Sequence, residues 1–129
     1  MKDFIDFKKV SVELLENEIL CTHYKNGFTI TEADAREIDD AQLLMCAEKE
    51  VGMLVDLYDI DNKISKEAKE FFTKKGKMLA YTKAVAIVQK EKQDNLPGGF
   101  FSSFIKPIYP VRTFESKQLA LTWLKTLKD

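Results

Sequence analysis

The fold is indicated most clearly by residues 110–125, which read Pro-Val-Arg-Thr-Phe-Glu-Ser-Lys-Gln-Leu-Ala-Leu-Thr-Trp-Leu-Lys. Residues 111–114 are typical of a short strand, because β-branched and aromatic side chains fit a half-buried extended backbone. Ser116 then suits the N-cap of a helix. The apolar residues of that helix share one stripe, at positions 119, 120, 123, 124 and 127. The stretch therefore predicts a strand followed by an amphipathic helix.

Two further strands are predicted upstream, over residues 9–15 and 19–24. Val10, Val12 and Leu14 alternate with polar residues, which is the pattern of a strand with one face in solvent. The polar turn at 16–18 favours a hairpin between the two strands. Residues 1–7 mix charged and apolar side chains, and we expect an irregular start there.

A first helix is predicted from an N-cap at Thr31 to about Lys49. Its buried stripe is expected to consist of Ala35, Ile38, Ala41 and Met45. The side chains expected in solvent are those of Glu32, Arg36, Asp39 and Asp40. Gly52 is expected to end the connection that leads to the next strand, residues 53–57.

The second half of the chain continues the alternation. Ser65 suits the N-cap of a second helix that ends near Gly76, with Ala68, Phe71 and Phe72 facing inward. Residues 84–88 are apolar at successive positions, as in a parallel strand with both faces covered. A loop at 97–99 (Pro-Gly-Gly) precedes a short third helix over about 100–105.

The predicted order is therefore β-β-α-β-α-β-α-β-α, with no linker within residues 1–129. This order predicts a single α/β domain. Its mixed sheet of four or five strands has an antiparallel leading hairpin and is otherwise mostly parallel, with about four helices on its faces.

Composition narrows the classes of partner. The 129 residues carry 20 basic and 21 acidic side chains, so no excess of positive charge favours nucleic acid or an anionic membrane. No apolar run reaches the ~20 residues that span a bilayer, and the first residues lack a signal-peptide pattern. The two cysteines do not form a disulfide framework, which favours a reducing, cytoplasmic setting.

A family resemblance rests on several short stretches in order. The chain resembles the SpoIIAA-like, or STAS, superfamily, and most closely the uncharacterised bacterial branch often labelled STAS/SEC14-like. The resemblance covers about residues 19–127. The stretches that carry it are residues 23–27 (His-Tyr-Lys-Asn-Gly), 55–57 (Val-Asp-Leu), 70–72 (Glu-Phe-Phe), 84–88, 104–107 (Phe-Ile-Lys-Pro), 111–114 and 120–124.

The resemblance implies a fold and a regulatory class of protein. Anti-sigma-factor antagonists of this superfamily are switched by phosphorylation of a serine at the start of the second helix, in an Asp-Ser-Ser-Gly-like turn. This chain has Ile64-Ser65-Lys66-Glu67 there, so it keeps one hydroxyl and lacks the acid, the second serine and the glycine. Ser65 is therefore either a plain N-cap or a phosphate acceptor beside Lys66.

Other polar residues are candidates for a ligand-binding, metal-binding or catalytic site. Asp56, Asp59 and Asp61 lie at the C-terminal end of a predicted central strand, the edge where open α/β sheets bind ligands. Lys63 and Ile64 break the pattern of a calcium loop, so a solvated turn is the favoured interpretation. His23 is the only histidine, and it shares a strand face with Cys21. Without an evident third group to orient the imidazole, the pair does not predict a catalytic nucleophile.

The sequence thus predicts a non-enzymatic regulatory or protein-interaction module without a cofactor or metal. The alternative is a carrier of a small apolar or lipid-like ligand beneath residues 97–105, in a pocket lined by Phe71, Phe72, Phe100 or Phe104. A homodimer through an exposed first strand is a further expectation. The residues expected to form the partner or ligand surface are Asp59, Asp61, Ser65, Lys66, Phe100, Phe101 and Phe104.

Overall fold

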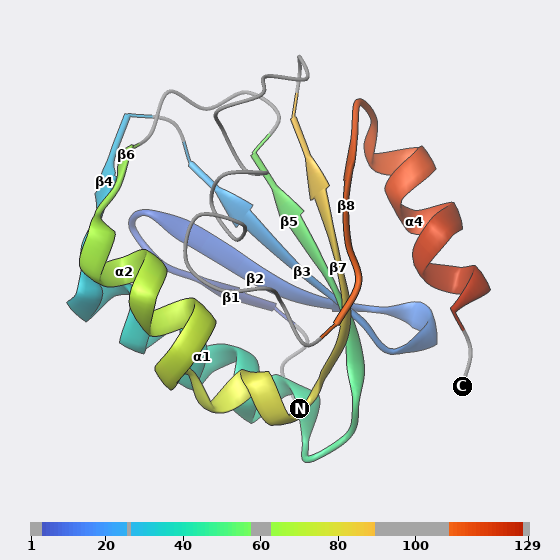
Figure 1. The fold of residues 1–129 in the computed structure, drawn as a ribbon, viewed down its shortest axis with the longest axis horizontal. Coiled ribbons are helices and arrows are strands. Elements are labelled where there is room, and N and C mark those ends of the chain that lie inside the picture. Colours follow the sequence, from blue (N-terminus) through green and yellow to red (C-terminus); the bar gives the residue numbers. More distant parts are fainter. Residues whose placement is uncertain (1–3, 26, 58–62, 90–108, 128–129) are drawn as a thin grey trace.

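The computed structural model describes residues 4–25, 27–57, 63–89 and 109–127. Six strands form one sheet in the order β1-β2-β3-β5-β7-β8 (Figure 1). β1, β2 and β3 pair antiparallel, and β3, β5, β7 and β8 pair parallel, which confirms the predicted fold class. The strands are β1 (Phe4–Asp6), β2 (Val10–Leu15), β3 (Ile19–Tyr24), β5 (Val51–Asp56), β7 (Thr82–Val88) and β8 (Val111–Phe114).

The start of the chain is more regular than predicted. Phe4–Asp6 forms β1 and pairs with β2, with Ile5 opposite Val12, so the expectation of an irregular start is wrong. The described edges of the sheet are therefore β1 and β8, whereas the strand expected at the edge, β2, lies inside. Homodimerisation through an edge stays a prediction.

A second, two-stranded ladder stands beside the main sheet. β4 (Thr29–Ile30) pairs parallel with β6 (Lys63–Ile64), so the chain leaving β3 is tied to the chain entering the second helix. Neither strand was predicted, because two residues carry no periodicity that a pattern search can detect.

The first helix, α1 (Glu32–Cys46), begins with a complete capping box in which Thr31 and Asp34 exchange hydrogen bonds. It ends three residues before the predicted boundary, because Ala47 and Glu48 adopt left-handed conformations with φ of 52° and 64°. The predicted stripe is confirmed as buried. Asp39 is also buried, so its expected place in solvent is wrong.

The remaining helices follow the predicted caps. Ser65 caps α2 (Lys66–Glu70), which continues as the π-helical turn η2 (Phe71–Lys75) and the 3-10 turn η3 (Lys77–Ala80). Ser116 caps α4 (Lys117–Thr126). The described residues contain three α-helices, fewer than the four expected, and the helix predicted at 100–105 lies outside the described residues.

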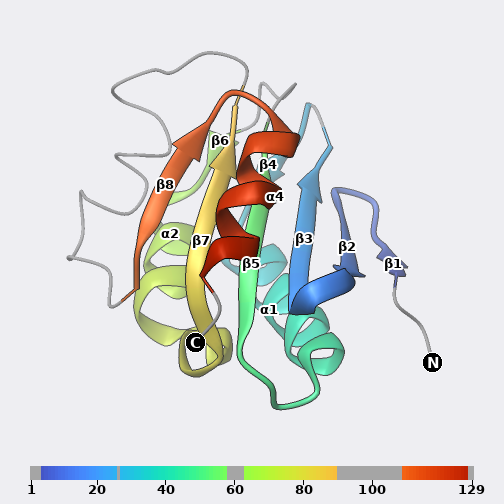
Figure 2. The same cartoon turned by 90° about the vertical axis from the view of Figure 1, so that its right-hand side faces the viewer.

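Helices cover both faces of the sheet, with α1 and α2 on one side and α4 on the other (Figures 1 and 2), and each face has its own apolar layer. On the α1 side, Val85 and Ile87 of β7 pack with large side chains from α1, η2 and η3. On the α4 side, Ala84, Ala86 and Val88 of the same strand pack with Ala120 and Leu124. This alternation confirms that residues 84–88 form an interior strand covered on both faces.

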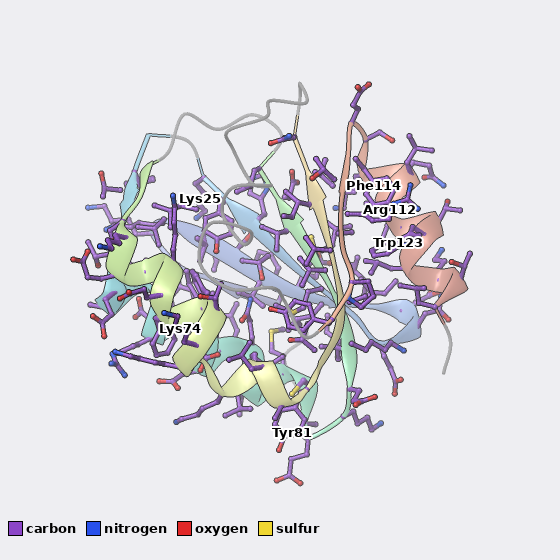
Figure 3. The ribbon with its side chains drawn as sticks, in the orientation of Figure 1. Lys25, Lys74, Tyr81, Arg112, Phe114 and Trp123 are labelled. Carbon is purple, nitrogen blue, oxygen red and sulfur yellow. The ribbon has the colours of Figure 1, made fainter. Side chains whose placement is uncertain are left out.

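The α4 layer depends on small residues. Gly52 lies within β5, not in the preceding connection as expected, and a Cβ there would lie 3.2 Å from Leu124 Cδ2. The ring centroids of Trp123 and Phe114 lie 5.6 Å apart, and the Arg112 guanidinium lies over both rings (Figure 3). Leu119, the first residue of the predicted apolar stripe, is 57 % exposed, whereas Ala120 and Leu124 are buried.

Candidate functional site

The start of α2 is the part of the predicted surface that the structure describes. The Ser65 hydroxyl accepts a hydrogen bond from the Ala68 N–H at 3.0 Å, and the Ser65 N–H donates to the Ile30 carbonyl of β4 at 3.0 Å. Lys66 is exposed beside it. The other residues predicted for this surface lie outside the described residues, namely Asp59, Asp61, Phe100, Phe101 and Phe104.

His23 lies next to Asp56, a pairing that was not predicted from the sequence. His23 and Asp56 stand side by side on β3 and β5, and Nδ1 of His23 lies 3.0 Å from Oδ2 of Asp56. The carboxylate can therefore orient the imidazole, which is half exposed at the carboxyl end of the sheet. Sequence spacing missed this pair because only the parallel register of two strands brings these residues together.

Cys21 lies two residues before His23 on β3, on the same face of the sheet. Burial raises the pKa of the Cys21 thiol to about 11, an effect larger than the lowering by the Lys117 ammonium. Within the described residues, no hydrogen bond joins the thiol to the imidazole. A protonated, buried thiol is a poor nucleophile, so the arrangement favours a packing role for Cys21.

We searched the described residues for side chains that could bind a metal ion. No group of three or more His, Cys, Asp or Glu side chains there is arranged to hold a metal ion.

The strand order bears on nucleotide binding. The parallel strands β3, β5, β7 and β8 follow one another in chain order, so these strands lack the reversal at which doubly wound sheets bind nucleotides.

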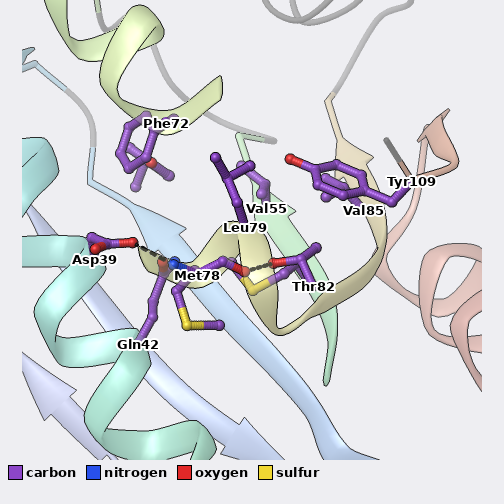
Figure 4. Close-up of a pocket in the computed structure, with 11 residues that line it drawn as sticks. Asp39, Gln42, Val55, Phe72, Met78, Leu79, Thr82, Val85 and Tyr109 are labelled. Carbon is purple, nitrogen blue, oxygen red and sulfur yellow. Dashed lines mark hydrogen bonds between the residues drawn. The ribbon is translucent and has the colours of Figure 1, made fainter. Parts of the chain in front are cut away.

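The described residues line a partly open cavity on the α1 side of the sheet (Figure 4). Its volume is ≈ 50 Å³, which holds about three to five water-sized groups. The sheet forms the floor, α1 forms one wall, and η2 and η3 form another. The lining residues are Tyr24, Asp39, Gln42, Met53, Val55, Phe72, Met78, Leu79, Thr82, Val85 and Tyr109.

Polar side chains from α1 shape one wall of this cavity. Both carboxylate oxygens of Asp39 accept backbone hydrogen bonds, from the Lys77 N–H at 2.9 Å and the Met78 N–H at 3.1 Å. They thereby hold the first turn of η3 against α1. Gln42 donates from Nε2 to the Thr22 hydroxyl at 2.8 Å, so its Oε1 remains available to the cavity.

The ligand pocket expected from the sequence lies beneath residues 97–105, outside the described residues, and it stays a prediction. Of the residues expected to line that pocket, Phe72 lines the cavity described here, whereas Phe71 is buried and lies outside the lining. Tyr24, Asp39, Gln42 and Tyr109 were missed. A possible signal was the row Ile38, Ala41, Met45, because Asp39 and Gln42 flank it on the same helix.

These features define a SpoIIAA-like α/β protein. A crystal structure of an uncharacterised protein from the DUF3478 family with a SpoIIAA-like fold, from Shewanella loihica PV-4, superposes with a TM-score of 0.65. The two chains are 22 % identical over 89 % of this chain and 91 % of the other, a level that establishes the fold alone.

A family model for a domain of unknown function, DUF7793, matches residues 14–128, and the chain belongs to that family. No curated protein matches the sequence. No helix formed by the described residues is long and apolar enough to cross a membrane.

Proposed function

We propose that this protein is a cytoplasmic, non-enzymatic regulatory or protein-interaction module formed by one SpoIIAA-like domain. The surface proposed to bind the partner is the rim around the start of α2. Ser65 and Lys66 are its described members, and the other proposed members are Asp59, Asp61, Phe100, Phe101 and Phe104.

The observation that carries this proposal is the fixed position of an exposed, charged helix start. The β4–β6 ladder, the Ser65 cap and the bond to Ile30 hold the backbone in place, while Lys66 and Glu67 project into solvent. A surface that is already ordered loses little conformational entropy when a partner binds.

The test is cross-linked capture of partners from the source cells, quantified by mass spectrometry. The wild type should enrich a defined protein, and Lys66→Glu should reduce that enrichment at least about tenfold, as for a contact worth about 1.4 kcal/mol. Lys125→Glu is the matched control, because Lys125 is an exposed helical lysine on α4, on the other side of the sheet. Equal capture by wild type and Lys66→Glu would contradict the proposal.

A second function is favoured by one observation, the cavity on the α1 side. It supports a carrier of a small, mainly apolar ligand, because apolar walls with a few polar groups are typical of ligand pockets. The segment at 97–105, beneath which such a ligand was expected, lies outside the described residues. Native mass spectrometry of protein isolated from its own cells should then show a bound small molecule, and ligand-free protein alone would count against a carrier.

A further inference from the structure

The cavity contains hydrogen-bonding groups that the described protein leaves without partners. Tyr24 and Gln42 are each 4 % exposed and both line the cavity. Among the described residues, nothing hydrogen-bonds to the Tyr24 hydroxyl or to Gln42 Oε1. Both residues line one cavity, and polar groups in protein interiors are nearly always hydrogen-bonded, so an occupant of the cavity, either water or a ligand, is needed to complete them.

The hydroxyl of Tyr109 is a third polar group at this cavity. Tyr109, just before β8, directs its hydroxyl toward Val55 and Leu79 across the cavity (Figure 4). Its hydroxyl is also without a hydrogen bond to any described residue. The cavity therefore offers two hydroxyls, which donate or accept, and one amide oxygen, which only accepts.

The charge of the lining limits the occupant. Among the described lining residues, Asp39 is the only ionisable acid or base besides the two tyrosines, and the backbone of η3 already occupies both of its oxygens. A carboxylate or phosphate entering the cavity would lose its hydration without meeting a cation from any described lining residue, which is strongly unfavourable. An uncharged occupant is thus the one that fits.

We propose that the cavity binds the hydroxyl-bearing end of an uncharged alkyl compound, with the hydroxyl donating to Gln42 Oε1 and accepting from Tyr24. The ≈ 50 Å³ volume takes only a few non-hydrogen atoms, so the rest of such a molecule extends beyond the cavity. This inference rests on the carrier function proposed above and names its ligand class, an alcohol rather than a fatty acid.

The test uses hexan-1-ol and hexanoate as probes, added to the full chain at pH 7. The protein carries methyl-labelled methionine, because the chain has only four methionines and two of them, Met53 and Met78, line the cavity. Met45 is buried in the same layer outside the lining and serves as the internal reference. Hexan-1-ol should shift the Met53 and Met78 signals in a saturable way, and hexanoate should bind at least about tenfold more weakly.

Two variants complete the experiment. Tyr24→Phe removes only the hydroxyl and should weaken hexan-1-ol binding by about fivefold or more, as expected for one lost hydrogen bond. Leu79→Trp should fill the cavity and abolish the shifts, whereas Leu44→Trp, at a position on α1 that is 75 % exposed, should leave them unchanged.

The possible failures are distinguishable. Equal binding of hexan-1-ol by wild type and Tyr24→Phe, or equal binding of both probes by the wild type, would overturn hydroxyl recognition and leave a carrier of apolar ligands standing. Absence of any saturable shift with either probe would mean that only water occupies the cavity, and would overturn this inference and the carrier proposal together.

Discussion

The two faces of the sheet bury their apolar residues in different ways. On the α4 side, small residues allow the helix to approach the strands closely, as where Leu124 packs over Gly52 in the layer that also contains Ala86. On the α1 side, longer side chains and the buried polar residues Asp39 and Gln42 fill the layer and leave a cavity. The comparison indicates that the α4 layer serves stability and that the cavity described above lies on the opposite side of the sheet.

The largest expected effect comes from opening the closely packed layer. Leu124→Ala deletes a side chain that is 4 % exposed, and it should lower the free energy of unfolding by about 2–5 kcal/mol. Leu119→Ala on the same helix should change it by less than about 0.5 kcal/mol, because Leu119 is mostly exposed. Urea denaturation measures both, and similar losses for the two variants would contradict a sealed α4 layer.

The next effect concerns the polar anchor of the α1 layer. Asp39→Ala leaves the Lys77 and Met78 N–H groups without an acceptor and should cost about 2–3 kcal/mol. Asp39→Asn keeps one carbonyl acceptor and should cost less. Asp40→Ala, at the exposed neighbouring position, is the control and should be close to wild type in thermal unfolding. An Asp39→Ala variant as stable as that control would refute the anchoring role.

Two neighbouring residues of β7 allow a direct comparison of the faces. Ala86 faces α4 and Val85 lines the cavity. Ala86→Val should destabilise by about 1–3 kcal/mol, because the layer has no room for added methyl groups. Val85→Ile should be neutral or stabilise by about 0.5 kcal/mol, because a cavity accepts the extra methylene. If both variants lose the same stability by chemical denaturation, the two layers do not differ in packing.

The smallest expected effect appears in alkaline solution. Because burial raises the pKa of Cys21 from 9.0 to about 11, the folded state favours the protonated thiol. The stability from this preference is fully present below pH 9 and is lost as the pH rises toward 11. The stability difference between wild type and Cys21→Ala should therefore shrink by about 1 kcal/mol between pH 8 and pH 10. A difference that stays constant would mean that the thiol is not desolvated.

Much of the fold follows from local patterns in the sequence. The apolar run at 84–88, the strand at 111–114 and the caps Thr31, Ser65 and Ser116 all have the predicted structure. These predictions hold because each depends on neighbouring residues: alternation along a strand, or a hydroxyl that accepts from a backbone N–H three residues later.

The features that were missed depend on contacts between distant residues. β1 is only three residues long and exists through pairing with β2. Asp39 is buried because it caps a turn 38 residues further along the chain, which no helical periodicity predicts. For the same reason the sequence placed Phe72 in a pocket without identifying Tyr24 or Gln42, which reach the cavity from β3 and α1.

The difference between the faces is tested most directly by a crystal structure of the protein under xenon pressure. Xenon enters apolar cavities of this kind and reports both layers in one experiment. We expect a xenon atom in the α1-side cavity, between Val85 and Leu79, and none between α4 and the sheet. Xenon beneath α4, or an α1 side without xenon, would contradict the account.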